Sequence, residues 1–291
     1  MQSIQTNSIT DTIINTINTI FNTFFSSIDE NLYSILDKLV FINTDILSDI
    51  NIKNILNSNN IILIANSLIV GFVIYYCIKL LFSHLFYIEI ERPYQFIFKI
   101  LIFTICINFS YFICEQFIYF NDLISSSILQ IGKNIFNHNI NFSSLIEKIN
   151  YLINMEKNNF NIFSIDGLLK GFISIELFNL VLSYSLRYIL IKIFVIMSPF
   201  AFLTLINSST SWFFKSWFRT FLSLLLLQAF VSIIFLIVFS LDVTFNDIFS
   251  KLLYISGIYI LSKANIYIRE LIGGVSLNIS SYVNHFKGVT K

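Results

Sequence analysis

Four long apolar stretches constrain the fold of this chain more than any other feature of its sequence. They begin near Ile61, Phe96, Gly171 and Phe221, and each approaches or exceeds the roughly 18 residues that mark a candidate transmembrane helix. The chain is 56% hydrophobic and only 12% charged, whereas soluble domains carry about 25% charged residues. We therefore expect an all-α fold, a polytopic membrane helical bundle of about five transmembrane helices with additional amphipathic and interfacial helices.

Composition divides the chain into three parts. Residues 1–59 predict an extracytoplasmic amphipathic segment, residues 60–268 the transmembrane bundle, and residues 269–291 a short basic cytoplasmic tail. Within the bundle, the Asn-rich residues 121–166 predict an exposed outer loop with a helical piece around Phe142 to Ile153. The N-terminal residues show no signal peptide, so we expect the first insertion signal in the span that starts near Ile61.

The N-terminal segment has the periodicity of a helix. Its apolar residues recur at steps of three and four: Ile13, Ile17, Ile20, Phe24, Ile28, Leu32, Ile35 and Leu39. This spacing places them on one face of a helix. We expect such a helix to lie on the membrane or pack against a partner, and packing within the subunit is an equal alternative.

The apolar runs predict five crossings, at about 61–82, 96–120, 168–191, 221–241 and 248–268. The third run stays apolar to about Ile206, which is longer than the ~20 residues that cross the hydrocarbon. Because Pro199 interrupts this run, we expect residues 194–206 to be a proline-broken segment that returns along or into the interface. With five crossings, the excess of basic residues places the N-terminus outside and the C-terminus in the cytoplasm.

A polar stripe is predicted in the third span. Glu176, Asn179, Ser183 and Arg187 fall within about 80° of one another around a helix. Ionisable groups at membrane depth cost roughly 2.5–3.5 kcal/mol each, so they rarely face lipid. The stripe is expected to line a conduit or, as the alternative, to form hydrogen bonds between helices or subunits. Arg187 has a third interpretation, which is snorkelling at the cytoplasmic boundary.

The segment before the fourth span combines aromatic and basic residues. Trp212 and Trp217 are the two tryptophans of the chain, and Lys215 and Arg219 lie between and beside them. Aromatic rings together with basic side chains favour the membrane–water boundary. The segment therefore predicts an interfacial helix that enters the fourth span. A docking surface for a cytoplasmic partner is compatible with this interpretation.

The sequence carries no recognisable catalytic, cofactor or metal site. The histidines are far apart, which argues against a metal site, and the cysteines all lie in apolar spans, where they are expected to be small apolar residues. Neither a nucleotide-binding glycine pattern nor a nucleophile motif occurs. Glu115, an isolated acid in the second span, is a weak indication of proton or ion handling. We expect a protein that is not an enzyme and needs no cofactor or metal.

One region is similar to a known family. From Ile191 to Leu226, an apolar helix ends in a Ser-Pro step, and an apolar run, a polar turn, an aromatic segment and a long apolar helix follow. This order resembles the signature region of the TrbL family, the polytopic inner-membrane subunits of type IV secretion and conjugation machines. The matching positions in this region are Ser198, Pro199, Trp217 and Arg219, and the pair Gly273–Gly274 after the last span also resembles the C-terminal pattern of the family.

The resemblance implies a non-catalytic channel or scaffold subunit in the bacterial plasma (inner) membrane, present in several copies as a homo-oligomer. It implies as partners the other membrane subunits and the cytoplasmic ATPases of a secretion machine, together with membrane lipid. The machine would transfer DNA or protein, and no sequence-specific binding of nucleic acid is expected.

A small-solute or ion transporter or channel subunit is the main alternative. Such folds commonly contain internal repeats and helices broken by Gly or Pro, and this chain has only two prolines and eight glycines. A membrane-embedded enzyme and a structural subunit of another complex, such as a respiratory one, are further alternatives. The identity of the neighbouring genes separates these possibilities.

Overall fold

The computed structural model describes residues 12–21, 23, 35–47, 60–86, 91–152, 164–241 and 248–272. All regular secondary structure in these ranges is helical, which confirms the all-α class. Long apolar runs favour helices in a membrane because a helix bonds all its backbone polar groups within one segment.

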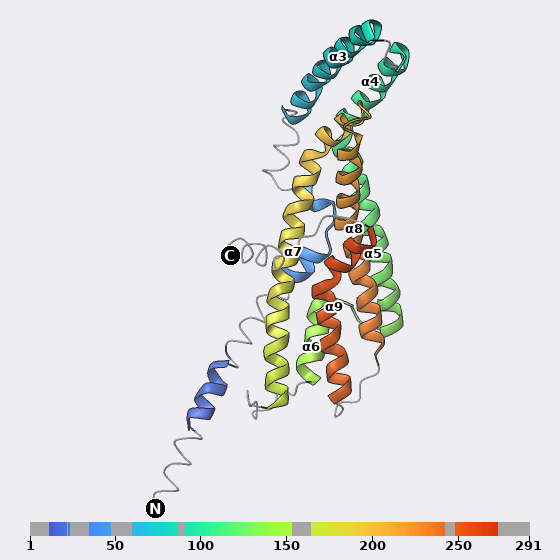
Figure 1. Cartoon of the computed structure of the whole chain (residues 1–291). Coiled ribbons are helices and arrows are strands. Elements are labelled where there is room, and N and C mark those ends of the chain that lie inside the picture. The colour runs from blue at the N-terminus through green and yellow to red at the C-terminus, as the bar shows by residue number, and fades with distance from the viewer. Residues whose placement is uncertain are drawn as a thin grey trace, which may run out of the picture. The chain divides into compact units, whose positions relative to one another are not determined.

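Seven long helices follow one another in the described part of the chain (Figure 1). They are α3 (Asn60–Phe86), α4 (Pro93–Asn108), α5 (Ser110–Phe136), α6 (Phe142–Leu152), α7 (Ile165–Leu203), α8 (Ser211–Ser240) and α9 (Ile248–Ile272), and the short 3-10 helix η1 (Thr44–Leu47) precedes them. Residues 12–21 and 35–40 are also helical.

The chain forms two compact units. Unit 1 comprises Met1–Phe41, Ile124–Leu186 and Gln228–Asn265, and unit 2 comprises Ile42–Leu123, Arg187–Leu227 and Ile266–Lys291. The boundaries fall inside α5, α7, α8 and α9, so each of these helices contributes residues to both units.

Three of the described helices, α3, α7 and α8, are long and apolar enough to cross a membrane, and α4 and α5 together make a fourth candidate. This is consistent with a multi-pass membrane protein. The prediction of about five crossings is matched only in part. The predicted fifth span forms a helix, α9, that is long enough but is not among the candidates. Lys251 and Lys263 lower its mean hydropathy.

The predicted second span, 96–120, differs from the structure in its middle and at its C-terminal end. It is divided at Phe109, where α4 and α5 meet at a bend of 60°. From there α5 continues to Phe136, so the first part of the predicted loop 121–166 is helical, and α6 confirms the helical piece expected around Phe142. The polar residues that end the apolar run are compatible with a helix because they find partners. One example is Ser125, whose hydroxyl lies 2.6 Å from that of Ser232 on α8.

The predicted break at Pro199 is wrong, because α7 is one helix that contains the proline and ends at Leu203. Neighbouring helices make an interior proline tolerable in a membrane. The helix ends instead in 3-10 type bonds, which include one from the Ile206 N–H to the Leu203 carbonyl at 3.2 Å. Residues 207–210 then turn the chain into α8.

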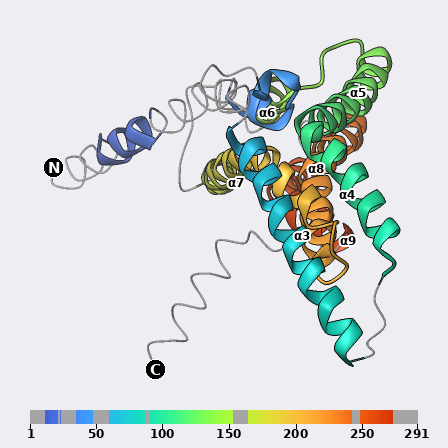
Figure 2. The same cartoon turned by 90° about the horizontal axis from the view of Figure 1, so that it is seen from above.

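The core of unit 2 is an apolar cluster from α3, α4, α5, α7 and α8. At its edge α3 and α4 run side by side (Figure 1, Figure 2), and the rings of Tyr76 and Phe96 stack with centroids 3.8 Å apart. In its most apolar window only 11% of α3 is buried, against 67% of α8. Helix α8 is therefore mostly buried by its neighbours, whereas most of α3 is exposed.

In unit 1 the aromatic side chains of α8 pack against α6. The ring of Phe235 packs edge to face against Phe142, with ring centroids 4.7 Å apart, and the centroid of the Phe41 ring lies 6.0 Å from that of Phe235. Gly257 of α9 faces Val238 of α8 so closely that a Cβ atom at the glycine would lie 2.8 Å from a valine methyl. Close approach of α8 and α9 therefore depends on this glycine.

Candidate functional site

Arg187 lies fully buried where α7 packs against α8 in unit 2. Its Nε donates a hydrogen bond to the carbonyl oxygen of Leu224 across 2.7 Å. A helix carbonyl can accept this bond because it has a second lone pair beyond the one used in the helix. The burial and the bond argue against snorkelling of Arg187 at the boundary and support a role in joining two helices.

A hydrogen bond from Trp217 joins the same two helices in the opposite direction, from α8 to α7. The indole Nε1 of Trp217 donates to the carbonyl oxygen of Phe194 on α7 across 3.1 Å. The ring is 5% exposed and is surrounded by aromatic rings with centroids 5.4–6.5 Å away: Phe194, Phe202, Phe214, Phe218 and Phe221. Trp217 is thus a core residue, whereas Trp212 is 67% exposed and keeps the interfacial interpretation.

The four residues of the predicted stripe differ in their surroundings. Glu176 and Arg187 are buried, Ser183 is half-buried and Asn179 is exposed. Asn179 lies about 60° from Glu176 at 100° per residue, which places it at the edge of the arc. Glu176, Asn179 and Ser183 belong to unit 1, whereas Arg187 belongs to unit 2. The stripe is therefore not one uniform buried face.

Unit 1 contains an ionisable cluster that the sequence did not reveal. Lys251 of α9 pairs with Asp166 at the start of α7 at 2.7 Å. One turn further along α7, the fully buried Lys170 donates to the amide oxygen of Asn150 on α6, also at 2.7 Å. The sequence does place an acid, Asp166, at the start of the third apolar run and a base, Lys251, at the start of the fifth. It does not show that these two helix ends lie together in the fold.

Two further polar side chains are buried in unit 1. Glu176 is 8% exposed and Ser174 is 3% exposed. The Oε2 of Glu176 and the Oγ of Ser174 form no hydrogen bond with any described residue. A buried carboxylate oxygen without such a bond is costly, so the environment of Glu176 calls for a functional explanation.

Asp37 links the N-terminal part of unit 1 to α6. Its Oδ1 accepts the backbone N–H of Phe142 at 2.9 Å, so it caps the first turn of α6 from a distant segment. Burial raises the pKa of Asp37, and its hydrogen bonds from the backbone N–H groups of Phe142 and Ser143 offset part of this rise. The carboxyl group is therefore harder to ionise than an exposed aspartate.

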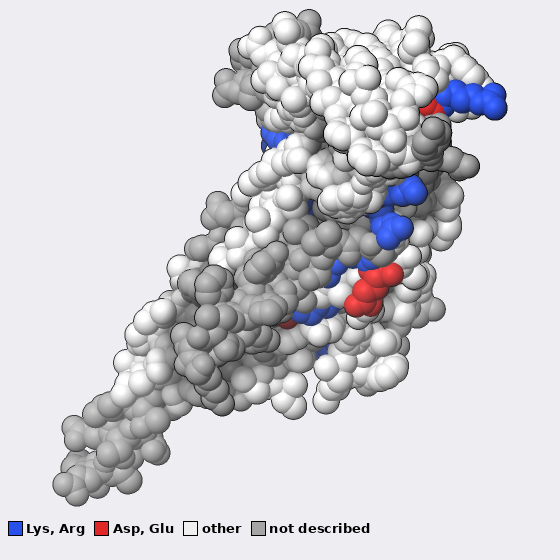
Figure 3. Space-filling model, turned by 45° about the horizontal axis from the view of Figure 1, so that its top comes forward, with Lys and Arg blue, Asp and Glu red and all other residues white. Residues whose placement is uncertain are grey.

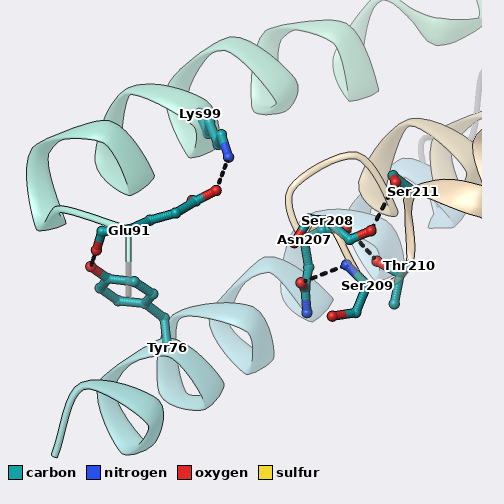
Figure 4. A network of polar contacts seen from close by, with 8 residues as sticks. All are labelled: Tyr76, Glu91, Lys99, Asn207, Ser208, Ser209, Thr210 and Ser211. Atoms are coloured by element: carbon teal, nitrogen blue, oxygen red, sulfur yellow. Dashed lines mark hydrogen bonds and ion pairs between the residues drawn. The ribbon is translucent and has the colours of Figure 1, made fainter. Parts of the chain in front are cut away.

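The turn between α7 and α8 is held by its own side chains (Figure 4). The Oδ1 of Asn207 accepts the N–H of Ser209 at 3.0 Å, and the hydroxyl of Thr210 donates to the carbonyl of Thr204 at 2.8 Å. Short polar side chains favour turns because they bond to nearby backbone groups in this way. The hairpin is thus closed by local bonds at its end and by Arg187 and Trp217 between its helices.

The positions that match the TrbL pattern fall into three groups. Ser198, Pro199 and Trp217 are buried in the hairpin, and Ser198 lies beside the thiol of Cys114 on α5. Arg219 is exposed near the start of α8. The last two positions, Gly273 and Gly274, lie outside the described residues.

Charged groups are sparse on the face drawn in Figure 3, where most of the described surface is neither acidic nor basic. Among the described residues, no three His, Cys, Asp or Glu side chains come close enough to hold a metal ion.

Comparison of the sequence with models of protein families finds no family that matches, and comparison with curated proteins finds no match either. The function of the protein is therefore inferred from its own residues.

Proposed function

We propose that the protein is an integral membrane channel or scaffold component of a type IV secretion machine, which transfers DNA or protein across the bacterial plasma membrane. The observation that carries this proposal is the α7–α8 hairpin of unit 2. Three of the residues that resemble the TrbL pattern, Ser198, Pro199 and Trp217, are buried in this single element. Their burial supports the view that the resembling pattern specifies a defined helical hairpin.

In this proposal the hairpin is a rigid scaffold, and the start of α8 is a contact surface. Trp212, Lys215 and Arg219 are all exposed in the first turns of α8, and α8 is about 45 Å long at 1.5 Å per residue. Because the hydrocarbon core is about 30 Å thick, α8 is longer than the core, and the proposal assigns these exposed aromatic and basic turns to the excess length. They would contact the cytoplasmic ATPases or other membrane subunits of the machine.

The proposed orientation, with the N-terminus outside and the C-terminus in the cytoplasm, needs an odd number of crossings. The three single candidates and the bent α4–α5 pair make four, so the orientation requires α9 to cross as well. Its Lys251 is paired with Asp166, which reduces the cost of placing this lysine in the membrane. Accessibility of single tags at the two termini, measured in intact and opened cells, tests this topology.

Purification of the tagged full-length protein from its own host in a gentle detergent tests the secretion proposal. Mass spectrometry should find secretion ATPases and other channel subunits in stoichiometric amounts, together with several copies of this chain. A variant that carries Trp212→Ala and Arg219→Ala should lose these partners while its own level stays normal. Recovery of the protein as a homo-oligomer without such partners would contradict the proposal.

The buried ionisable residues of unit 1 support a second candidate, a small-solute or ion transporter or channel subunit. Ionisable residues inside membrane segments commonly mark ion or proton paths, and Lys170 and Glu176 are both buried in α7. Ion and proton flux into vesicles that contain the purified protein tests this candidate. Flux that Glu176→Gln abolishes would favour it, whereas flux equal to that of empty vesicles would exclude it.

A further inference from the structure

Unit 2 contains an apolar groove between α3 and the α7–α8 hairpin. Its volume is about 540 Å³, and it is lined by Leu68, Phe72 and Tyr75 of α3 and by Phe200, Leu203 and Phe213 of the hairpin. Cavities of roughly 300–1,000 Å³ with mostly apolar walls are typical of sites for small molecules. The groove is thus large enough for a long apolar group and offers it almost no polar contact.

A small polar recess adjoins this groove. It shares Phe72, Tyr75 and Asn207 with the groove, and Lys79 and Glu91 complete its polar wall. Its volume of about 50 Å³ leaves room for a compact polar group only. Figure 4 shows this end of the unit, where the turn that holds Asn207 approaches the α3–α4 hairpin. Groove and recess together form a site for a molecule with a long apolar part and a small polar part.

The charge of the recess selects an anionic group. The carboxylate of Glu91 is paired with Lys99, and its backbone carbonyl accepts the Tyr76 hydroxyl at 2.7 Å. Lys79 forms no ion pair within the described ranges, and it is the one cation among the residues that line the recess. Because the acid that lines the recess is already paired with Lys99, the charge of Lys79 remains to attract an anion. A lysine ammonium is a common partner of phosphate groups.

Asn207 supplies a second donor. Its side-chain oxygen accepts the Ser209 N–H, and because Asn207 lines the recess, its amide N–H group is the donor that we assign to a bound anion. Basic pockets between transmembrane helices are known to bind the head groups of anionic lipids. The groove and the recess share a wall, so one amphiphilic molecule can occupy both. Its acyl chain would lie in the apolar groove and its phosphate in the recess.

We propose that unit 2 binds one anionic phospholipid, with an acyl chain in the groove and its phosphate at Lys79 and Asn207. The inference requires that the protein is embedded in a membrane, and it is independent of the proposed role in secretion. It differs from general solvation by lipid because it names one position, one head-group charge and one set of residues.

Substitution of Gly71 tests the groove. A Cβ atom at Gly71, which lines the groove, would meet nothing within 4 Å, so Gly71→Trp can fill the groove without a clash at its first atom. Val70→Trp is the matched control, because Val70 is 59% exposed and does not line the groove. Each full-length protein is purified from vesicles of phosphatidylglycerol and phosphatidylcholine, and retained lipid is counted by native mass spectrometry.

The wild-type protein and Val70→Trp should retain one phosphatidylglycerol molecule, and Gly71→Trp should lose it. Lys79→Gln should reduce the preference for phosphatidylglycerol over phosphatidylcholine about tenfold, because a charge-assisted hydrogen bond is worth about one decade of affinity. Equal retention by Gly71→Trp and Val70→Trp, or a wild-type protein without preference between the two lipids, would overturn the proposal. Circular dichroism of each variant shows whether its helices are intact.

Discussion

The indole Nε1 of Trp217 donates a hydrogen bond to the carbonyl oxygen of Phe194 across 3.1 Å, from α8 to α7. A second bond runs in the opposite direction, from the Nε of Arg187 on α7 to the carbonyl of Leu224 on α8. The donor and the acceptor on each helix lie seven residues apart, which is about two turns. The antiparallel helices of the hairpin are thus joined at two levels, and each helix provides one donor and one acceptor.

Trp217→Phe is expected to destabilise the protein while it keeps an aromatic ring in the cluster. The substitution removes the N–H donor to Phe194, and side-chain hydrogen bonds between membrane helices contribute about 0.6–1.5 kcal/mol. Thermal unfolding in detergent should therefore show a lower Tm. Trp212→Phe is the matched control, because Trp212 is 67% exposed, and its Tm should equal that of the wild type. The same loss in both variants would contradict a specific role for the Trp217 bond.

Arg187→Leu is expected to impair assembly of the proposed secretion machine or transfer by it. The substitution removes a fully buried side chain that donates to Leu224, and bonds from charged groups contribute about 1.5–3 kcal/mol. Subunit levels measured by immunoblotting and transfer frequency measured by mating or secretion assays test this expectation. Unchanged transfer at a normal subunit level would show that the arginine has no central role.

Gly257→Ala is expected to separate α8 from α9. The new methyl group would lie 2.8 Å from one methyl of Val238 and 3.3 Å from the other, and a β-branched side chain cannot easily rotate away. Overpacking of this kind costs about 1–3 kcal/mol. Gly71→Ala is the control, since its Cβ has open space, and alanine stabilises a helix by up to about 1 kcal/mol over glycine. A denaturation midpoint of Gly257→Ala at or above that of Gly71→Ala would disprove close packing at this position.

Asp37→Asn is expected to change how stability depends on pH. Because burial raises the folded-state pKa of Asp37, the stabilisation from its protonated form is complete below the unfolded pKa of about 3.9 and is lost as pH rises through the folded pKa. Asparagine keeps the oxygen that accepts the Phe142 N–H but does not ionise. The Tm of the variant should match that of the wild type near pH 4 and exceed it at pH 7. A constant Tm difference across this range would contradict the shifted pKa.

The positions of the helices follow closely from the sequence. The apolar runs that begin near Ile61 and Phe221 lie in α3 and α8, because an uninterrupted apolar run leaves the backbone few alternatives to a helix in a membrane. Two boundaries were mispredicted for the same reason. Local composition suggests a break at Pro199 and a loop after Phe120, yet packing against other helices supports a helix through both positions.

The candidate sites were predictable only in part. The four residues of the stripe were identified from their spacing, but spacing alone could not show that Asn179 is exposed while Glu176 is buried. Likewise the two tryptophans are five residues apart in one segment, and only their packing distinguishes the buried Trp217 from the exposed Trp212. The groove beside Gly71 had no signal in the sequence, because its walls come from three helices.

The sequence by itself determined that the chain is helical and where its long apolar segments lie, because these depend on local composition and on the demand that every backbone group be bonded. Only the tertiary structure decided which polar groups meet. Lys251 finds Asp166 across 85 residues of chain, and Arg187 finds the carbonyl of Leu224 on the next helix. Such pairs depend on which helix faces pack together. Helical periodicity shows which residues share a face of one helix, but it does not show which other helix packs against that face.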